Sequence, residues 1–257
     1  QTMIERIQTE NRPHGTICVA FTPDEEIGMG AEHFNLDQFG AEYAYTLDGD
    51  SEGEIQYENF NACKAEFEIR GFNVHPGEGK DTMINASLVA IEINNCLPSM
   101  ETPRGTEDYE GFYHLISMQG EVGEAKLNYI VRDHDKNGFE ERKKTLRLIE
   151  KNLNAKWGEG TVTLKITDQY LNMKEIVEEH MHLIDHAKKA CEAAGVAPLI
   201  LPIRGGTDGC QLSFKGLPCP NLGTGGHAFH GPYEHISVEG MEKSVELLLA
   251  LIQEYTK

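Results

Sequence analysis

The hydrophobic pattern between positions 61 and 169 constrains the fold more than any other feature of this sequence. Residues 65–70 alternate apolar and charged side chains, as a half-exposed strand does, and Thr82–Cys96 has the spacing of a helix that Pro98 ends. Further strands are predicted at 112–120, 125–132 and 161–166, with a helix at 139–153. The order strand, helix, strand, strand, helix, strand is typical of a ferredoxin-like α+β domain. We therefore expect 61–169 to be an inserted domain.

The segments on either side predict a second domain, made of residues 1–60 and 170–257. Their expected strands lie at 16–21, 42–47, 199–203 and 220–222, and their expected helices at 2–9, 175–194 and 238–255. A length of 257 residues allows either one large domain or two smaller ones, so the change of pattern near residue 60 decides the division. The predicted fold class is α/β, a mixed sheet with helices, plus the inserted α+β domain.

Charge and cysteine spacing restrict the partners and the compartment. The chain has 23 Lys and Arg against 42 Asp and Glu, a formal charge of −19, and no basic block. This balance argues against nucleic acid and anionic membranes as partners. The six cysteines show no C-x-x-C spacing, which is typical of reduced thiols in a cytoplasmic protein. The sequence does not specify an oligomeric state.

Acidic residues follow two of the expected strands of the first domain. Glu25 and Glu26 come after 16–21, and Asp48 comes after 42–47; His230 lies in a glycine-rich loop far downstream. The loops at the carboxyl edge of an α/β sheet gather ligands, and clustered carboxylates there are costly unless a cation or a proton compensates them. Carboxylate oxygens and an imidazole nitrogen are the ligands of hydrolytic zinc sites. The sequence therefore predicts metal chemistry at this edge.

Each of these residues also has an ordinary structural interpretation. An Asp-Glu-Glu run is often a solvated turn or a helix start, where carboxylates interact favourably with the helix dipole. Asp48 precedes a glycine, and Asp-Gly is a common β-turn pair. An isolated histidine such as His230 is more often a hydrogen-bonded surface residue. His227 is a rival ligand, and Glu234 could orient either imidazole ring.

A third group of histidines has the spacing of a metal site but lacks its partner. His182 and His186 are four residues apart, and His180 precedes them. In a zincin helix a glutamate follows the first histidine, whereas Leu183 occupies that position here. We interpret these three histidines as residues of a helix surface.

Five motifs lie along the chain in the order Phe21–Glu26, Thr46–Gly49, Asn73–Gly77, Arg204–Gly209 and Phe229–Gly231. In this order they resemble those of the peptidase T family of tripeptide aminopeptidases, which are co-catalytic zinc exopeptidases. The resemblance covers essentially the whole chain. It implies a zinc-peptidase domain with an inserted lid, two zinc ions in a complete site and a short peptide as substrate.

The resemblance assigns the catalytic and metal-binding roles. Glu25 matches the general base, which takes a proton from a zinc-bound water and delivers it to the leaving amine. Glu26 and His230 match ligands of one zinc ion, and Asp48 matches a ligand of the other. Adjacent glutamates can divide these tasks because neighbouring side chains on a turning backbone diverge.

The resemblance also assigns substrate contacts. Arg204 matches the residue that binds the C-terminal carboxylate of the peptide, for which a guanidinium offers two parallel hydrogen bonds. A pairing of Arg204 with Asp208 is the structural alternative. His75 matches a lid histidine that stabilises the oxyanion, and Arg132 is a second candidate from a lid strand; either could instead be a surface side chain.

Two motifs of the family are not found. The family carries a His-x-Asp motif near its N-terminus and a later Asp-Asp motif, which supply a histidine ligand, the bridging aspartate and a further carboxylate. Position 1 falls inside a helix that follows the bridging aspartate in the family, so we expect this chain to be a fragment that is inactive alone. Alternative functions are a two-zinc hydrolase of dipeptides or N-acyl amino acids, and a non-catalytic association module.

Overall fold

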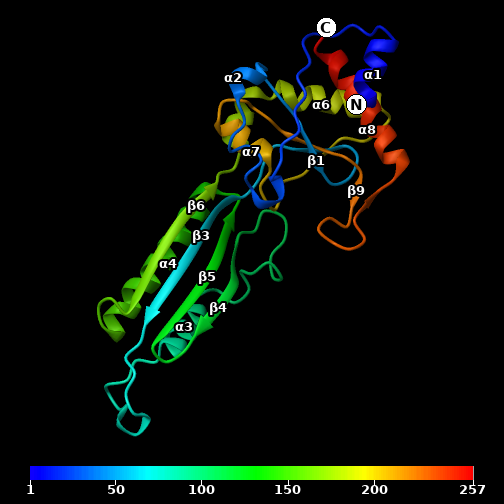
Figure 1. The fold of residues 1–257 in the computed structure, drawn as a ribbon. Helices are drawn as coiled ribbons and strands as arrows, with labels where there is room; N and C mark the ends of the chain where they lie inside the picture. The colour runs from blue at the N-terminus through cyan, green and yellow to red at the C-terminus, as the bar shows by residue number, and fades with distance from the viewer. Residues whose placement is uncertain (257) are drawn as a thin grey trace. The chain divides into compact units, whose positions relative to one another are not determined.

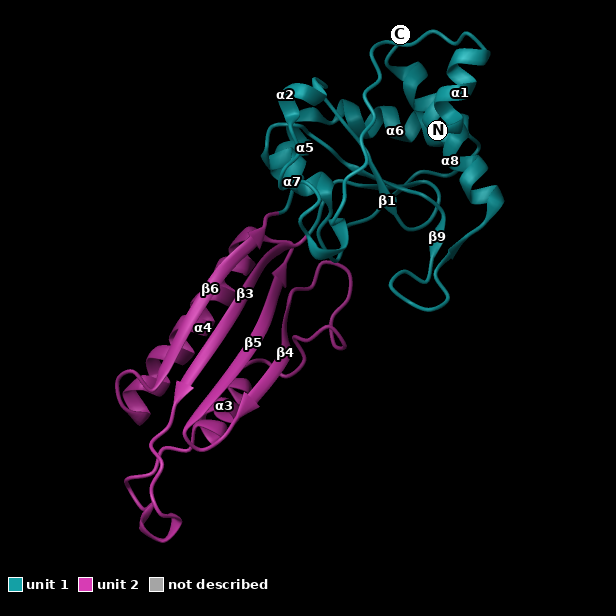
Figure 2. Ribbon diagram, viewed as in Figure 1, with its two compact units in different colours: residues 1–59, 172–257 teal, residues 60–171 magenta. Residues whose placement is uncertain are grey.

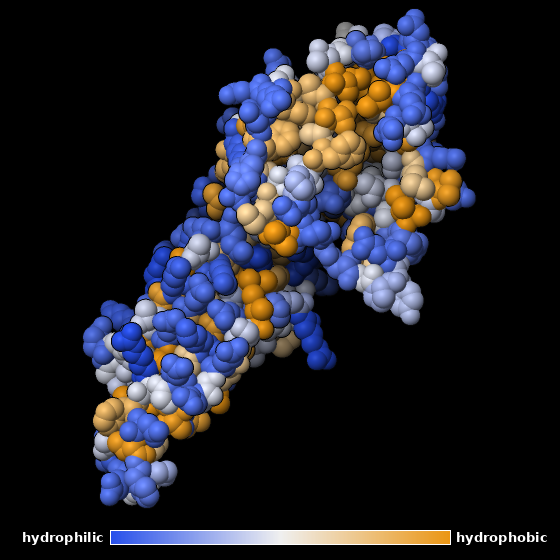
Figure 3. Space-filling view, in the orientation of Figure 1, coloured by the Kyte–Doolittle hydropathy of each residue, from blue (hydrophilic) through white to orange (hydrophobic). Residues whose placement is uncertain are grey.

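The computed structural model describes residues 1–256, which form two compact units. The first unit contains residues 1–59 and 172–257 and the second contains residues 60–171 (Figure 2). We describe each unit by itself. The hydrophilic surface in Figure 3 agrees with the net charge of −19, and apolar residues gather around α6 and α8 of the first unit. No helix within residues 1–256 combines the length and the apolar character that a membrane crossing requires.

The second unit is an antiparallel sheet with two helices (Figure 1). Its strands lie in the order β4-β5-β3-β6, and every neighbouring pair is antiparallel. The element order is the one that the hydrophobic pattern predicts, but the second helix, α4, is longer than the expected 139–153. The elements are β3 (Asn61–Arg70), η2 (Pro76–Glu78), α3 (Ala86–Asn95), β4 (Phe112–Gly120), β5 (Glu124–Asp133), α4 (Lys136–Trp157) and β6 (Val162–Tyr170).

One hydrophobic core holds the second unit together. Alternate residues of β3, including Phe67, are buried together with Tyr129 of β5 and with Val89 and Leu146 of the two helices. From Lys64 onward the intervening β3 residues are charged, so one face of the sheet packs against both helices and the other carries polar side chains. Asp135 caps α4, because its carboxylate accepts a hydrogen bond from the Gly138 amide at 2.6 Å.

The first unit contains a short mixed sheet in the order β1-β8-β2-β7 and a separate β9-β10 pair. Strands β1 and β8 are parallel, whereas β2 is antiparallel to β8. The strands are β1 (Thr46–Gly49), β2 (Glu54–Gln56), β7 (Leu199–Ile200), β8 (Asn221–Gly223), β9 (Gly226–His227) and β10 (His235–Ile236). The helices are α1 (Thr2–Thr9), η1 (Glu25–Ile27), α2 (Leu36–Phe39), α5 (Lys174–Val177), η3 (Glu178–His180), α6 (His182–Ala193), α7 (Asp208–Phe214) and α8 (Val238–Glu254).

Two expectations for the first unit are wrong. The segment 16–21 is not a strand: it is irregular, and Val19 and Phe21 are 51% and 91% exposed. A strand needs a neighbour for its backbone groups, and none of the strands within residues 1–256 pairs with this segment. The helix expected at 175–194 is divided into α5, η3 and α6, and Gly195 follows its end in the left-handed conformation.

The core of the second unit makes a stability prediction. Phe67→Ala removes a fully buried ring and should lower the free energy of unfolding by about 3–5 kcal/mol, because a cavity remains. The same change at Phe72, which is 54% exposed, is the matched control and should cost less than about 1 kcal/mol. Urea unfolding followed by fluorescence of the single tryptophan, Trp157 in α4, measures this unit directly. Equal losses in both variants would contradict the assignment of the core.

Candidate active site

The two adjacent glutamates lie in a short, tightly defined turn. Glu25 and Glu26 begin the 3-10 helix η1, which is flanked by Asp24 and Gly28, both in the left-handed conformation with φ of 62° and 75°. The Gly28 amide donates to the Glu25 carbonyl at 2.7 Å, and the Met29 amide donates to the Asp24 carbonyl at 3.0 Å. A left-handed aspartate is uncommon, so this turn has a specific backbone shape.

The structure brings Glu26 and His230 together, although they are far apart in the chain. Glu26 Oε2 lies 3.4 Å from His230 Nδ1, and both side chains are largely exposed. His230 occupies a loop after β9 with a left-handed φ of 59°, and its amide donates to Glu234 Oε2 at 3.1 Å. Glu234 therefore contacts the backbone of His230. The rival His227 lies in β9, with its ring 5.4 Å from that of His235.

Asp48 belongs to the same electrostatic neighbourhood. It lies in β1, and its amide donates to Asn221 Oδ1 of the neighbouring β8 at 3.1 Å. Burial raises the pKa of Asp48, and the charges of Asp208 and Glu26 raise it further. Asp48 thus lies near the carboxyl end of β1 beside the parallel strand β8, the kind of position at which α/β sheets gather ligands.

Glu25 has the most perturbed carboxyl of the site. Burial is the main cause that raises its pKa to about 7. The negative charges of Asp48, Asp208 and Glu26 add to the shift, and His230 opposes it. A carboxyl with a pKa near neutrality can both accept and release a proton at physiological pH, which suits a general base.

Asp208 also belongs to the group of carboxylates around Glu25 and Asp48. From the sequence it is expected only as a partner of Arg204. It is the first residue of α7 and is 4% exposed, and neither of its carboxylate oxygens has a hydrogen-bond partner. Asp208 is therefore not hydrogen-bonded to Arg204. Arg204 is exposed, and the residue before it, Ile203, forms a backbone bridge with Asn59.

The described residues do not make a complete metal site. Glu26, Asp48 and His230 have donor atoms that zinc accepts. However, within residues 1–256 no group of three or more His, Cys, Asp or Glu side chains converges closely enough to hold a metal ion. The chain contributes a carboxylate–imidazole pair and nearby carboxylates, and additional ligands would be needed.

The two remaining predicted residues belong to the second unit and have contrasting surroundings. His75 is exposed and caps η2, with its Nδ1 accepting a hydrogen bond from the Gly77 amide at 3.2 Å. Arg132 in β5 is only 9% exposed, and its Nη1 donates to the carbonyls of Cys63 and Val131. Its guanidinium also lies 5.2 Å from the centre of the Tyr170 ring. The surface alternative therefore does not apply to Arg132.

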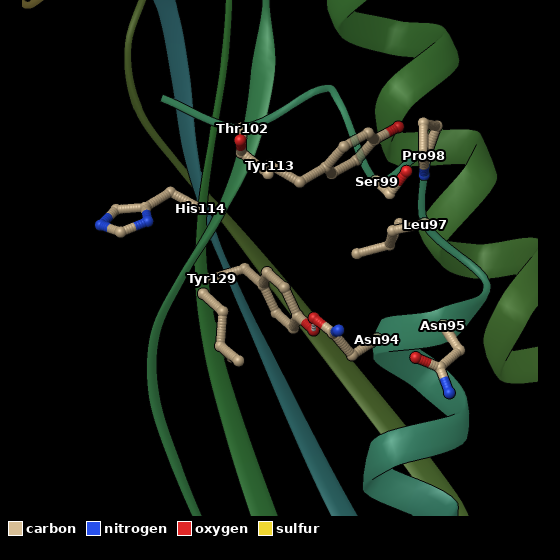
Figure 4. A pocket seen from close by; sticks show the side chains of 10 residues that line it. Asn94, Asn95, Leu97, Pro98, Ser99, Thr102, Tyr113, His114 and Tyr129 are labelled. Atoms are coloured by element: carbon tan, nitrogen blue, oxygen red, sulfur yellow. Dashed lines mark hydrogen bonds between the residues drawn. The ribbon is translucent and has the colours of Figure 1, made fainter. Parts of the chain in front are cut away.

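A cavity of about 370 Å³ in the second unit contains none of the predicted site residues. It lies between the end of α3, the following loop and strands β4 and β5, with Tyr129 and Asn94 directed toward each other (Figure 4). The Tyr129 hydroxyl donates to Asn94 Oδ1 at 3.0 Å. The lining contains no Asp, Glu, Lys or Arg side chain.

The histidines of the 180–186 region pack against tyrosines. The ring centres of His182 and Tyr43 are 4.7 Å apart, as are those of His186 and Tyr255. Burial lowers the pKa of His186, and the neighbouring His182 lowers it further. These residues are therefore half-buried packing elements, whereas the sequence predicted a plain helix surface.

Comparison with known proteins identifies the family. Residues 2–254 match peptidase family M20/M25/M40, and the chain belongs to this family. The curated Peptidase T of Halothermothrix orenii is 54% identical over 243 residues, which are 95% of this chain and 60% of that protein. The chain thus spans about three fifths of the length of this relative.

Solved structures share the fold. The aminopeptidase PepT of Bacillus cereus superposes with a TM-score of 0.86 at 25% identity, over 99% of this chain and 68% of that one. A tripeptidase of Staphylococcus aureus gives 0.86 at 19% identity, over 98% and 67%. The YXEP protein of Bacillus subtilis, a dinuclear metal-binding M20 peptidase, gives 0.67 at 16% identity, over 91% and 64%.

The raised pKa of Glu25 predicts a pH dependence of stability. Its folded pKa of about 7 exceeds the ordinary 4.5, so the folded state holds the proton more tightly than the unfolded state. The resulting stabilisation is complete below about pH 4.5 and is lost as pH rises through about 7. The unfolding free energy, measured by circular dichroism with a chelator present, should therefore fall over this range relative to Glu25→Gln. Glu159→Gln, at an exposed position, is the control and should parallel the wild type.

The same titration tests the role of Asp208. Because its charge contributes to the shift of Glu25, Asp208→Asn should move the NMR titration midpoint of the Glu25 carboxyl toward lower pH. An unchanged midpoint would show that Asp208 is too distant or too well screened to contribute.

Proposed function

We propose that the whole protein is a zinc-dependent aminopeptidase that releases the N-terminal residue from tripeptides. The observation that carries this proposal is Glu25, a carboxyl with a pKa of about 7 beside the Glu26–His230 pair. Membership of a peptidase family and the shared fold with a tripeptidase and an aminopeptidase support the reaction class. The activity concerns the whole protein, because this chain matches 60% of its relative.

In this proposal Glu25 moves the proton. Its carboxylate accepts a proton from the attacking water, and the resulting carboxylic acid donates it to the leaving amine. A pKa near 7 allows both transfers at neutral pH, because neither protonation state is strongly favoured. Burial, the main cause of the shift, would also strengthen the interactions of Glu25 with developing charge.

Glu26, Asp48 and His230 are the proposed zinc ligands of this chain. A complete site of the proposed type holds two zinc ions, and further ligands are needed because these three side chains do not converge. The metal-binding relative with the same fold supports metal dependence of this kind. The crowding of Glu26, Asp48 and Asp208 around Glu25 also favours a cationic occupant.

The substrate contacts are proposed from three arginine and histidine side chains. Arg204, exposed at a glycine-rich bend, would bind the C-terminal carboxylate of the peptide through its planar guanidinium. His75 and Arg132 would contact the reacting carbonyl from the second unit, which we propose to be the lid domain. Arg132 already uses Nη1 for two backbone carbonyls, so its remaining N–H groups would serve the substrate.

The proposal is tested by restoring the unmatched part of the protein. We expect the 257-residue chain alone to bind zinc weakly and to show negligible tripeptide hydrolysis, because its ligands are incomplete. A fusion to the residues that precede the matched region in the Halothermothrix orenii Peptidase T should restore both properties. Isothermal titration with zinc and hydrolysis of a free tripeptide measure them. Robust turnover by the chain alone, or an inactive fusion that binds zinc tightly, would contradict the proposal.

The adjacent glutamates should have separable roles in this fusion. Glu25→Gln should lower kcat by about 10²- to 10⁴-fold while zinc content is retained, because only the proton carrier is lost. Glu26→Gln should lower zinc content, measured by elemental analysis. The opposite pattern would reverse the two assignments.

Arg204 tests the substrate class. Because it would bind ground state and transition state alike, Arg204→Ala should mainly raise KM, and Arg204→Lys should be nearly as damaging because an ammonium lacks the planar fork. Amidation of the tripeptide C-terminus should impair the wild-type fusion strongly and Arg204→Ala very little. Similar losses in both would favour the broader two-zinc hydrolase function.

A further inference from the structure

Helix α7 contacts the segment that directly follows the Glu25–Glu26 turn. Gln211 Nε2 donates to the Gly28 carbonyl at 3.0 Å. Lys215 Nζ donates to the Glu32 carbonyl at 2.7 Å and also to the Ala31 carbonyl. Asp208 and Gln211 of α7 and Lys215, the C-cap residue directly after it, share one face of the helix because they are three and four residues apart. This face is therefore directed toward residues 28–32, beside which α7 lies in Figure 1.

The third contact of α7 is the close approach of Asp208 to Gly30. A Cβ atom at position 30 would lie 2.3 Å from Asp208 Oδ2 and 2.5 Å from Oδ1. Gly30 is not in the left-handed region, so its conformation alone does not require glycine. The Asp208 carboxylate occupies the place that a side chain at position 30 would take, so a larger residue there would have to displace it.

The burial of Asp208 is costly for the fold. A buried carboxylate without hydrogen bonds loses its hydration without compensation, and native proteins carry few such groups. The start of a helix reduces this cost because the helix dipole favours negative charge there, but the Thr207 side chain makes no capping bond at this end. An uncompensated group of this kind is expected where function requires a particular arrangement.

We propose that the α7 face of Asp208, Gln211 and Lys215 is a positioning device for Glu25 and Glu26. The inference rests on the function proposed above, in which Glu25 carries the proton. The turn itself is short and has a left-handed residue at each end, so its own three backbone hydrogen bonds give limited rigidity. Gln211 fixes the Gly28 carbonyl at the end of the turn, and Asp208 blocks movement of Gly30 toward α7. A displacement of about 1 Å at such a site can cost on the order of 10²-fold in rate.

The first test uses the zinc-loaded fusion and the Gly30 contact. Gly30→Ala should force Asp208 and the segment apart and lower kcat by about 10- to 100-fold, with KM changed less than about threefold. Gly15→Ala is the matched control, because nothing lies within 4 Å of the added Cβ, and it should keep wild-type kcat. In an Asp208→Ala background, which opens the space, Gly30→Ala should cost less than about threefold more. Additive losses would overturn the inference.

The second test does not depend on activity and uses the 257-residue chain. The Gly28 and Met29 amides close the turn, so their hydrogen exchange reports its opening. Gln211→Met should speed this exchange by about two- to tenfold, as expected for one lost hydrogen bond. Gln253→Met is the matched control: Gln253 donates to the Pro13 carbonyl at 3.1 Å, and its loss should leave the turn unchanged.

The two tests separate the possible failures. If the fusion does not hydrolyse tripeptides but Gln211→Met speeds turn exchange, the proposed function fails and the positioning contact stands. If the fusion is active and neither Gly30→Ala nor Gln211→Met changes kcat or exchange, the positioning inference is overturned while the function stands.

Discussion

Burial of carboxylates that also repel one another, at one edge of a small sheet, is the constraint that governs the first unit. Burial disfavours the charged forms of Glu25 and Asp48 and is the larger cause of their raised pKa values. The charges of Glu26 and Asp208 raise the pKa of both further, and His230 opposes these shifts. The fold holds these groups together because β1 and β8 are parallel neighbours and α7 packs beside the Glu25–Glu26 turn. Such an arrangement favours the binding of a cation or a proton at this edge.

The second unit has a different source of stability. Its sheet and two helices share one apolar core, and ion pairs lie mainly at its surface, such as Lys126 with Glu68 at 3.0 Å. Some cationic side chains are largely buried: Arg142 pairs with Asp133 at 2.7 Å, and the Arg132 guanidinium lies against a tyrosine ring and backbone carbonyls. Its position is determined by packing, whereas His75 lies exposed at the start of a short turn. The two proposed substrate contacts of this unit therefore differ in how firmly the fold holds them.

Sequence reasoning succeeded where structure depends on local pattern. The alternation around Phe67 and the helical spacing before Pro98 are local, so the element order of the second unit could be predicted. It failed for 16–21, because an apolar β-branched run becomes a strand only if another strand pairs with it. It also missed β2 and α7, which are too short for periodicity to detect.

The sequence by itself determined which chemical groups are available: an adjacent glutamate pair, an aspartate after a strand and a histidine in a glycine-rich loop. Motif order was enough to indicate a peptidase family, since motifs are read residue by residue. Only the tertiary structure decided that Glu26 meets His230, that Asp208 is buried without partners and that Arg204 is not paired with it. These outcomes depend on distances between remote segments and on exclusion of water. Both arise from packing of the whole unit, and no local pattern encodes them.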